Sequence, residues 1–297
     1  MTNTLPFGAP SRFLDVGHSQ VPYFRVGRGP DVLFIHGWPL HAATFRDSVP
    51  LLSDRFTCHL IDLPGSGQSK WDASSKISLS DHARTVRAVV DQLKLSRYAV
   101  VAHDSGAVIA RLLAAEDDRI TGLVLGNSEI PGHRPWQLGL YLALNRVPFG
   151  ATLFGLGLRF RALRHSALAF GGCFHDPRVA DGEFRDLFLR PLQSPRVFAG
   201  ERRLLSSFDW RVIDGLADVH ARIRAPVKLV WGAQDPYFPL EKVRSTLNQF
   251  AGGATLSVID PGKLFWHEEF AERFARETEA FLEVCAAEAS RAMLSTA

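Results

Sequence analysis

The stretch "HDSG" at residues 103–106 presents two candidate nucleophiles at the end of an apolar run. The run "YAVVA" before it is typical of a buried strand, and "AVIARLLAAEDD" after it is typical of a helix. A nucleophile on a sharp strand-to-helix turn needs small residues two positions before and two positions after it. Asp104 meets this requirement with Ala102 and Gly106, whereas Ser105 has a histidine two residues before it. The sequence therefore predicts Asp104 as the nucleophile, with a helix-capping role as the alternative.

Polar residues also follow four other apolar runs, at the point where each run ends. They are His36, Glu129, Asp235 and the stretch from Lys263 to His267. The carboxyl ends of parallel strands lie at one edge of a sheet, which is where open α/β sheets bind their ligands. We therefore expect these five strand ends to converge on one functional surface.

The elements that must position these residues alternate between strand-like and helix-like patterns. This alternation predicts a doubly wound α/β fold with a mostly parallel sheet. It stops between residues 131 and 216, where short helix-like pieces rich in Arg, Phe, Leu and Pro replace the strands. We expect a core formed by residues 1–130 and 217–297, and an inserted helical cap formed by residues 131–216.

Composition narrows the classes of function. The 297 residues are 46% apolar and 22% charged, as in a folded globular chain. The formal charge is only +3, without a basic stripe, which argues against nucleic-acid binding. The three cysteines are far apart, which argues against a disulfide framework or a cysteine metal site. No apolar run reaches the ~18 residues of a membrane span, and the first residues lack a signal-peptide pattern. We expect a cytoplasmic protein that acts on a small molecule, and the oligomeric state stays open.

Four motifs resemble those of α/β-hydrolases, in the branch that contains haloalkane dehalogenases and epoxide hydrolases. They are "HGWP" (36–39), "DLPGSGQS" (62–69), "AHDSG" (102–106) and "WGAQDPYFP" (231–239). The resemblance implies a hydrolase without cofactor or metal, in which Asp104 attacks carbon and forms an alkyl-enzyme ester. A water activated by a histidine then hydrolyses the ester. The resemblance also implies an oxyanion hole made by the backbone N–H groups of Trp38 and Ser105, and Asp235 as the acid that orients the histidine.

The family pattern fails at the histidine. Members read Gly-His-Phe after the last strand, whereas this chain reads "IDPGKLFWHEEF". Lys263 or Leu264 occupies the histidine position, depending on how the flanking residues are aligned. His267 is the nearest histidine and the expected base, and His103 and His133 are outside candidates. The alternative function is a degenerate hydrolase fold that binds a small molecule without hydrolysing it.

The substrate clues favour an epoxide over an alkyl halide, and an apolar electrophile of small or medium size. Haloalkane dehalogenases usually carry Trp directly after the nucleophile, where this chain has Ser105. Epoxide hydrolases protonate the opening ring with two cap tyrosines. Here the expected cap holds only Tyr141, although Tyr237 lies near the site. Glu129 stands where some dehalogenases place the orienting acid, and His36 is expected to be a structural residue of the oxyanion loop.

Overall fold

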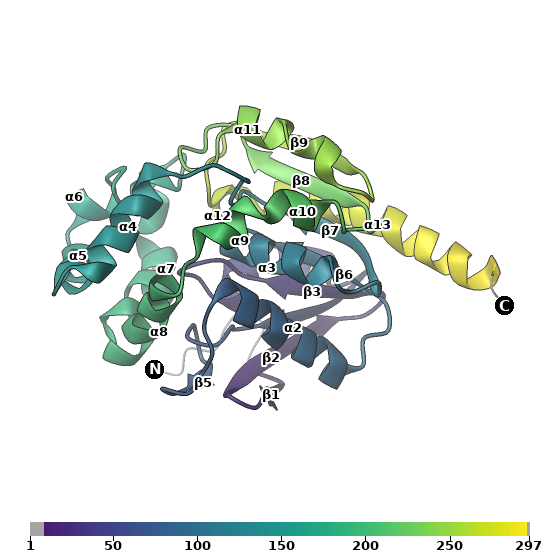
Figure 1. The fold of residues 1–297 in the computed structure, drawn as a ribbon, viewed down its shortest axis with the longest axis horizontal. Helices are drawn as coiled ribbons and strands as arrows, with labels where there is room; N and C mark the ends of the chain where they lie inside the picture. The colour runs from purple at the N-terminus through teal and green to yellow at the C-terminus, as the bar shows by residue number, and fades with distance from the viewer. Residues whose placement is uncertain (1–8, 296–297) are drawn as a thin grey trace.

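The apolar runs of the sequence become the strands of one nine-stranded sheet in the computed structural model, which describes residues 9–295 (Figure 1). The strands are β1 (Arg12–Asp15), β2 (Ser19–Gly27), β3 (Asp31–Ile35), β4 (Thr57–Ile61), β5 (Lys70–Trp71), β6 (Tyr98–Ala102), β7 (Ile120–Leu125), β8 (Val227–Gly232) and β9 (Ala254–Ile259). Strands β4 and β6 are buried along their whole length, as continuous apolar runs predict.

The sheet is antiparallel at one edge and parallel elsewhere. Its order is β1-β2-β4-β3-β6-β7-β8-β9, with β5 beside β2. Strands β1, β2 and β5 pair in an antiparallel manner, and every pair from β4 to β9 is parallel. The predicted α/β fold with a mostly parallel sheet is therefore confirmed. The parallel strands β3, β6, β7, β8 and β9 all end on the same side of the sheet, so the loops that follow them can share a site.

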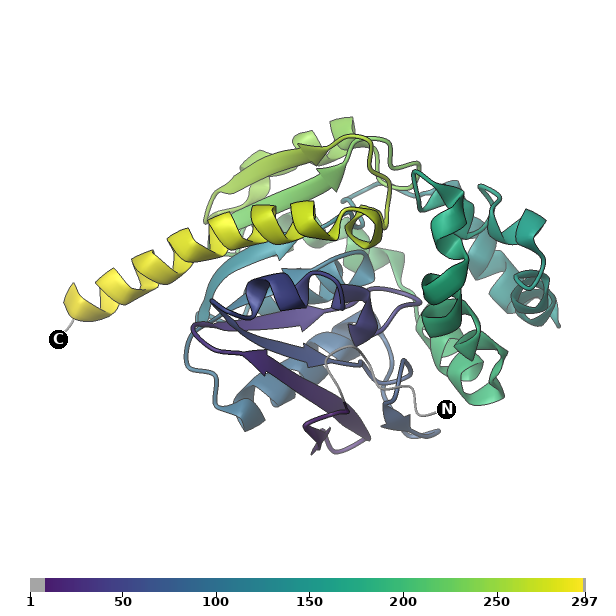
Figure 2. The same cartoon turned by 180° about the vertical axis from the view of Figure 1, so that it is seen from behind.

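Helices cover both faces of the sheet. In Figure 1, α2 (Leu79–Leu93), α3 (Ser105–Ala114) and α10 (Leu216–His220) lie in front of the sheet. The view from behind in Figure 2 shows α1 (Val49–Leu52) and the long α13 (Ala271–Ser295) across the other face. The short helices α11 (Leu240–Arg244) and α12 (Trp266–Glu269) follow β8 and β9. Among the described residues, no helix is long and apolar enough to cross a bilayer.

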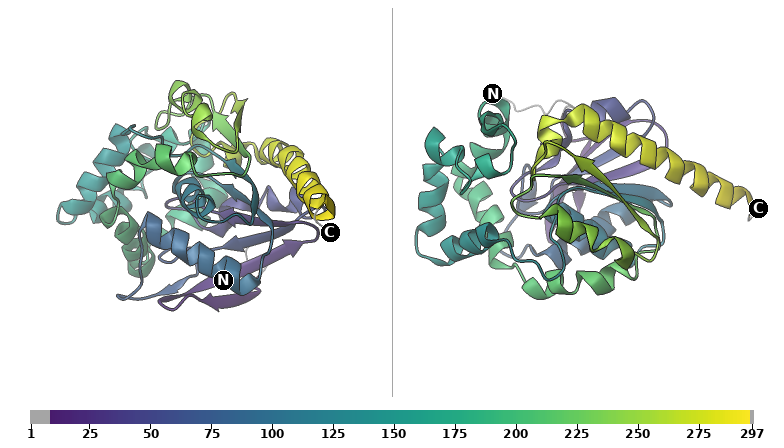
Figure 3. Two further views of the ribbon diagram at one scale, coloured as in Figure 1. Left: turned by 45° about the vertical axis from the view of Figure 1, so that its right-hand side comes forward. Right: turned by 90° about the horizontal axis from the view of Figure 1, so that it is seen from above.

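The regular elements that the structure describes between residues 131 and 216 are all helical. They are α4 (Trp136–Arg146), α5 (Gly150–Gly157), α6 (Arg161–Arg164), α7 (Gly182–Phe184), α8 (Pro195–Ser206), α9 (Trp210–Asp214) and short 3₁₀ and π turns, followed by the start of α10. Figure 3 shows most of these helices beyond one end of the sheet, apart from the layers of the core. We propose that residues 131–216 form a cap over the core.

The turn between β6 and α3 forces Asp104 into the left-handed region. Its φ is 51° and its ψ is −140°, a combination that costs a non-glycine residue free energy and persists only where the surroundings impose it. The backbone N–H of Asp104 donates to the Asn127 carbonyl at 2.7 Å. Behind the turn, a Cβ atom on Gly106 would lie 2.4 Å from the carbonyl oxygen of His36. The small residue two positions after Asp104 is therefore required by packing against the β3 strand end.

We predict that Gly106→Ala lowers the free energy of unfolding by about 1–3 kcal/mol, because the added methyl group forces apart the β3 and β6 strand ends. Gly139→Ala in α4 is the matched control, since no atom lies within 4 Å of the position of its new Cβ. Its free energy of unfolding should stay the same or rise slightly. Urea unfolding of both variants measures the difference, and equal stability of the two would refute this role of Gly106.

Candidate active site

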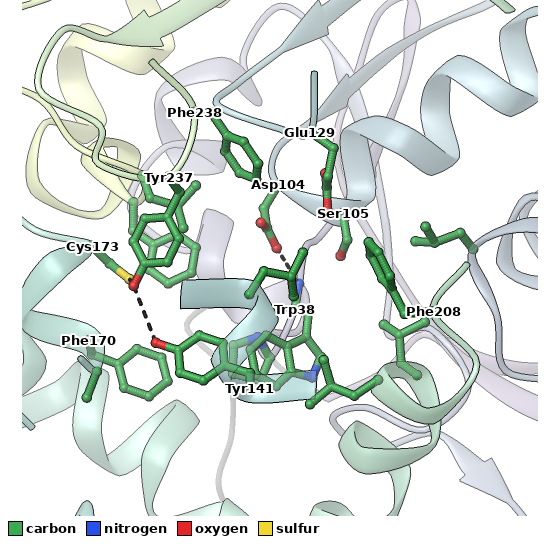
Figure 4. Close-up of a pocket in the computed structure, with 18 of the residues that line it drawn as sticks. Trp38, Asp104, Ser105, Glu129, Tyr141, Phe170, Cys173, Phe208, Tyr237 and Phe238 are labelled. Atoms are coloured by element: carbon green, nitrogen blue, oxygen red, sulfur yellow. Dashed lines mark hydrogen bonds between the residues drawn. The ribbon is translucent and has the colours of Figure 1, made fainter. Parts of the chain in front are cut away.

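A pocket of about 760 Å³, its mouth included, lies between the strand ends of the core and the helices of the cap. Its walls are mainly aromatic and aliphatic side chains, among them Trp38, Phe170 and Phe238 (Figure 4). A ligand in this pocket would leave water for a largely apolar surface. The few polar groups in the walls therefore decide which chemistry the pocket can perform.

Asp104 is one of those polar groups. Its side-chain Oδ2 accepts a hydrogen bond of 2.8 Å from the Trp38 backbone N–H (Figure 4). The Ser105 backbone N–H also donates to its carboxyl group. Burial raises the pKa of Asp104 well above its usual value, and the nearby Glu129 carboxylate raises it further. The residues predicted as nucleophile and oxyanion hole thus meet at one carboxyl group. Gly37 permits this approach, because a Cβ there would lie 2.5 Å from that of Asp104.

Glu129 contributes a second carboxyl group to the pocket wall, beyond the end of β7 (Figure 4). Its Oε2 accepts a hydrogen bond of 3.0 Å from the Ser128 hydroxyl. The Arg111 guanidinium donates to the Glu129 backbone carbonyl, not to the carboxylate. Burial raises the pKa of Glu129, although the Arg111 charge acts in the opposite direction. Two buried carboxyl groups in one apolar pocket resist double ionisation, so this pair tends to keep a proton.

Two tyrosine hydroxyls meet on another wall of the pocket. The Tyr141 and Tyr237 hydroxyl oxygens are 3.4 Å apart, and the Cys173 thiol lies 3.7 Å from that of Tyr237 (Figure 4). The Tyr141 hydroxyl also donates to the Leu168 carbonyl at 3.1 Å. Burial raises the pKa of both phenols, so both stay protonated at neutral pH. With the Tyr141 proton directed at a carbonyl, Tyr237 is the better proton donor to a ligand.

Asp235 is buried behind the pocket and bonded to amide groups. Its Oδ1 accepts hydrogen bonds from the backbone N–H groups of Tyr237 and Phe238, at 2.7 and 3.2 Å. Its Oδ2 accepts a hydrogen bond of 2.6 Å from the Asn127 side-chain amide. Burial raises the pKa of Asp235 to about 7, against the effect of these three bonds. Asp235 therefore has the surroundings of an orienting acid, but an asparagine takes the bond that a histidine would take.

Asn127 is itself held in one orientation. Its side-chain oxygen accepts hydrogen bonds from the Gly232 backbone N–H at 2.7 Å and from the Trp266 indole N–H at 3.0 Å. Its amide nitrogen must therefore face Asp235. Its local pattern did not single it out, although it lies two residues after the end of β7 and two residues before Glu129. Cys173 was also missed, because nothing in its local pattern signals a pocket.

The loop after β9 brings Leu264 to the pocket wall. Lys263, the other candidate for the histidine position, is not among the residues that line the pocket. In the described part of the chain, no histidine lines the pocket either. The side chain that this loop presents to the site is therefore a hydrocarbon, which can neither accept a proton nor bond to Asp235.

His267 lies in a separate buried cluster behind the turn of Asp104. Its Nε2 is 2.8 Å from the Thr44 hydroxyl, which donates to Glu268 at 2.6 Å, so His267 donates to Thr44. Its ring lies against that of His103, with centroids 4.0 Å apart and planes tilted by 39°. Burial lowers the pKa of His267 to about 3 and holds that of His103 well below its usual value. The structure does not bring the expected base to the pocket, because the start of α12 directs its side chain toward Thr44.

Two other histidines that the sequence singled out, His36 and His133, have structural partners. His36 bonds to the Gly37 carbonyl through Nδ1 at 3.0 Å and accepts from the Leu63 N–H through Nε2 at 3.0 Å. Burial lowers its pKa to about 4. Both ring nitrogens of His36 thus help to hold the loops that follow β3 and β4. His133 donates to the Tyr237 carbonyl at 2.8 Å and does not line the pocket.

Known proteins similar to this chain include several hydrolases. The chain is 36% identical over 119 residues to haloalkane dehalogenase 2 of Mycobacterium tuberculosis, a match to 40% of this chain and 42% of that protein. The chain thus spans less than half the length of that relative. It is 29% identical over 252 residues to the magnesium-chelatase 30 kDa subunit of Rhodobacter capsulatus, covering 82% of this chain and 84% of that one.

Solved structures share the fold. The epoxide hydrolase CorEH superposes with a TM-score of 0.78 at 18% identity, over 92% of this chain and 98% of that one. An ancestral haloalkane dehalogenase superposes with a TM-score of 0.77 at 21% identity, over 93% and 99%. The alpha/beta hydrolase fold family matches residues 30–270. The expected resemblance is thereby confirmed, and this chain belongs to the α/β-hydrolase fold family.

Proposed function

We propose that this protein opens small or medium-sized apolar epoxides by nucleophilic attack of Asp104 and hydrolyses the resulting ester slowly. The observation that carries the proposal is the Asp104 carboxyl group, aimed into an apolar pocket with one oxygen already bonded to the Trp38 N–H at 2.8 Å. That bond leaves the other oxygen to attack carbon.

In the first step, the free oxygen of Asp104 forms a bond to an epoxide carbon while the carbon–oxygen bond of the ring breaks. The departing alkoxide takes the proton of Tyr237, which the neighbouring Tyr141 hydroxyl assists. The product is a hydroxyalkyl ester of Asp104. The tyrosine pair favours an epoxide over an alkyl halide, because a leaving halide needs no proton and Ser105 offers no indole to hold it.

In the second step, water attacks the carbonyl carbon of this ester. The Trp38 and Ser105 N–H groups stabilise the oxyanion that forms, because both already donate to the same carboxyl group. The attacking water must also lose a proton. Among the described pocket residues, Glu129 is the group best suited to accept it, since the Tyr and Cys pKa values are raised. A carboxylate with a raised pKa can act as a base, but without an imidazole this step limits the rate.

The first prediction tests the nucleophile. Incubation with 1,2-epoxyoctane should add the mass of one intact epoxide to the protein, as measured by intact-protein mass spectrometry. Asp104→Asn should gain no mass, because the amide is a poor nucleophile. A modified peptide containing residue 104 locates the adduct. An adduct elsewhere, or none over a broad panel of epoxides, would favour the alternative function of a non-hydrolytic binding protein.

The second prediction concerns pH. Only the ionised carboxylate attacks, and the pKa of Asp104 is raised by burial and by Glu129. The rate of adduct formation should therefore rise as pH increases through this raised pKa and then level off, since the tyrosines stay protonated. Glu129→Gln removes the neighbouring charge, so its profile should shift to lower pH. The matched control is Asp118→Asn, which removes an 81% exposed carboxylate far from the pocket and should leave the profile in place.

The third prediction concerns release. If Glu129 accepts the proton of the attacking water, Glu129→Gln should form the adduct but lose it about 10²-fold more slowly than the parent protein. The decay of the adduct after removal of excess epoxide measures this rate. His267→Gln should release the ester at the parental rate, since its side chain lies outside the pocket. If the adduct instead decays more slowly in His267→Gln than in the parent protein, His267 is the base.

A further inference from the structure

Exposed apolar side chains are concentrated on one part of the cap. Of the ten large apolar side chains that are exposed among the described residues, seven lie between residues 136 and 168. They are Trp136, Val147, Phe149, Leu153, Leu156, Phe160 and Leu168. Phe149 and Phe160 are 77% and 72% exposed, at the two ends of α5. We call these seven residues the apolar cap surface. Such a concentration on one region marks an interaction site.

Helix α5 carries apolar residues on two faces. Its sequence, "GATLFGLG", contains no charged residue, and none of its residues is fully buried. Ala151, Phe154 and Gly155 face an inner cavity, whereas Leu153 and Leu156 are exposed. A helix at a water-facing surface normally has a polar outer side. Figure 1 shows α5 at the edge of the molecule far from the C-terminus, and Leu153 and Leu156 on its outer side are 66% and 44% exposed.

Two arginines beside the apolar cap surface carry positive charge without an acidic partner in the part of the chain that the structure describes. Residues 131–175 contain five arginines and no Asp or Glu. Three of the five form ion pairs with carboxylates from outside this segment, namely Arg134 with Asp214, and Arg161 and Arg164 with Asp181. Arg146 and Arg159 flank α5, and neither has an acidic partner within the described chain; Arg159 bonds to Gln193. An apolar helix between two exposed guanidinium groups presents hydrocarbon together with positive charge.

We propose that the apolar cap surface binds the surface of an anionic lipid bilayer, with α5 in the plane of the interface. Apolar side chains would enter the boundary between headgroups and acyl chains, and Arg146 and Arg159 would contact lipid phosphates. A second copy of this chain fits the surface less well, because it would bring the same uncompensated arginines together.

The position of α5 connects this surface with the pocket. The cavity on its inner side is lined by Trp38, Tyr141 and Phe154, and all three also line the pocket that contains Asp104. An apolar molecule dissolved in the bilayer would therefore have a short apolar route from lipid to Asp104. This second part rests on the proposed function, whereas binding of the bilayer does not.

Sedimentation with vesicles tests the proposal on the full chain. The protein should bind vesicles of phosphatidylglycerol and phosphatidylcholine more tightly than vesicles of phosphatidylcholine alone, and added salt should weaken the binding. The double variant Phe149→Ser/Leu153→Ser should lose about tenfold or more of its partition coefficient. The double variant Arg146→Gln/Arg159→Gln should lose about fivefold per arginine on anionic vesicles only.

Matched controls separate this surface from general effects. Leu51→Ser removes a 50% exposed leucine from α1, and Arg224→Gln removes an 81% exposed arginine outside the cap. Both should bind as the parent does, and so should Asp104→Asn, whose chemistry is lost. Circular dichroism verifies that each variant is folded. Absence of vesicle binding, or equal binding by all variants, overturns the proposal. So does a dimer in solution that Phe149→Ser/Leu153→Ser dissociates, which would assign the surface to a second copy.

Discussion

The left-handed backbone at Asp104 is the constraint on which the site depends. A residue at φ 51° points its side chain off the end of β6, away from both the strand and α3. The surrounding chain must then be small, and Gly37 and Gly106 leave room that a Cβ would fill. The hydrogen bond from the Trp38 N–H offsets part of the cost of burying a carboxyl group. The positive φ of Asp104, the space left by Gly37 and Gly106, and the Trp38 N–H together hold the Asp104 carboxyl group toward the pocket.

At Asp235, amide groups occupy the hydrogen-bonding positions in which a histidine ring was expected. Asp235 keeps the place of an orienting acid, but its bonds go to Asn127 and to two backbone N–H groups. Asn127 is in turn fixed by Trp266 and Gly232. Every member of this network is satisfied, so it stabilises the loop ends without needing a ligand. In the proposed function, Asp104 therefore keeps the geometry for attack on carbon, whereas the hydrogen bonds of Asp235 hold the loops together instead of orienting a base.

The sequence predicted the features that depend on local pattern. Continuous apolar runs indicated the parallel strands, and the spacing of Ala102 and Gly106 indicated the sharp turn. The sequence alone did not predict features that depend on contacts between distant segments. Tyr141 and Tyr237 meet across the cap and the core, and no local spacing reveals this. The direction of His267 depends on the turn before α12, which places its ring against Thr44 rather than Asp104.

In the proposed function, the apolar walls of the pocket affect both the attack by Asp104 and the hydrolysis of the ester. Burial in apolar walls raises the pKa of Asp104, so a smaller fraction of the carboxylate is ionised at neutral pH. The ionised fraction is poorly hydrated, and less water must be removed before it attacks carbon. Once the ester has formed, the buried charge is gone and the apolar walls fit the product better than the reactant. The same walls keep out the water that hydrolysis needs, and Leu264 supplies no base to activate it. In the proposed function, exclusion of water therefore makes the ionised fraction of Asp104 smaller but more reactive, and it slows hydrolysis of the ester.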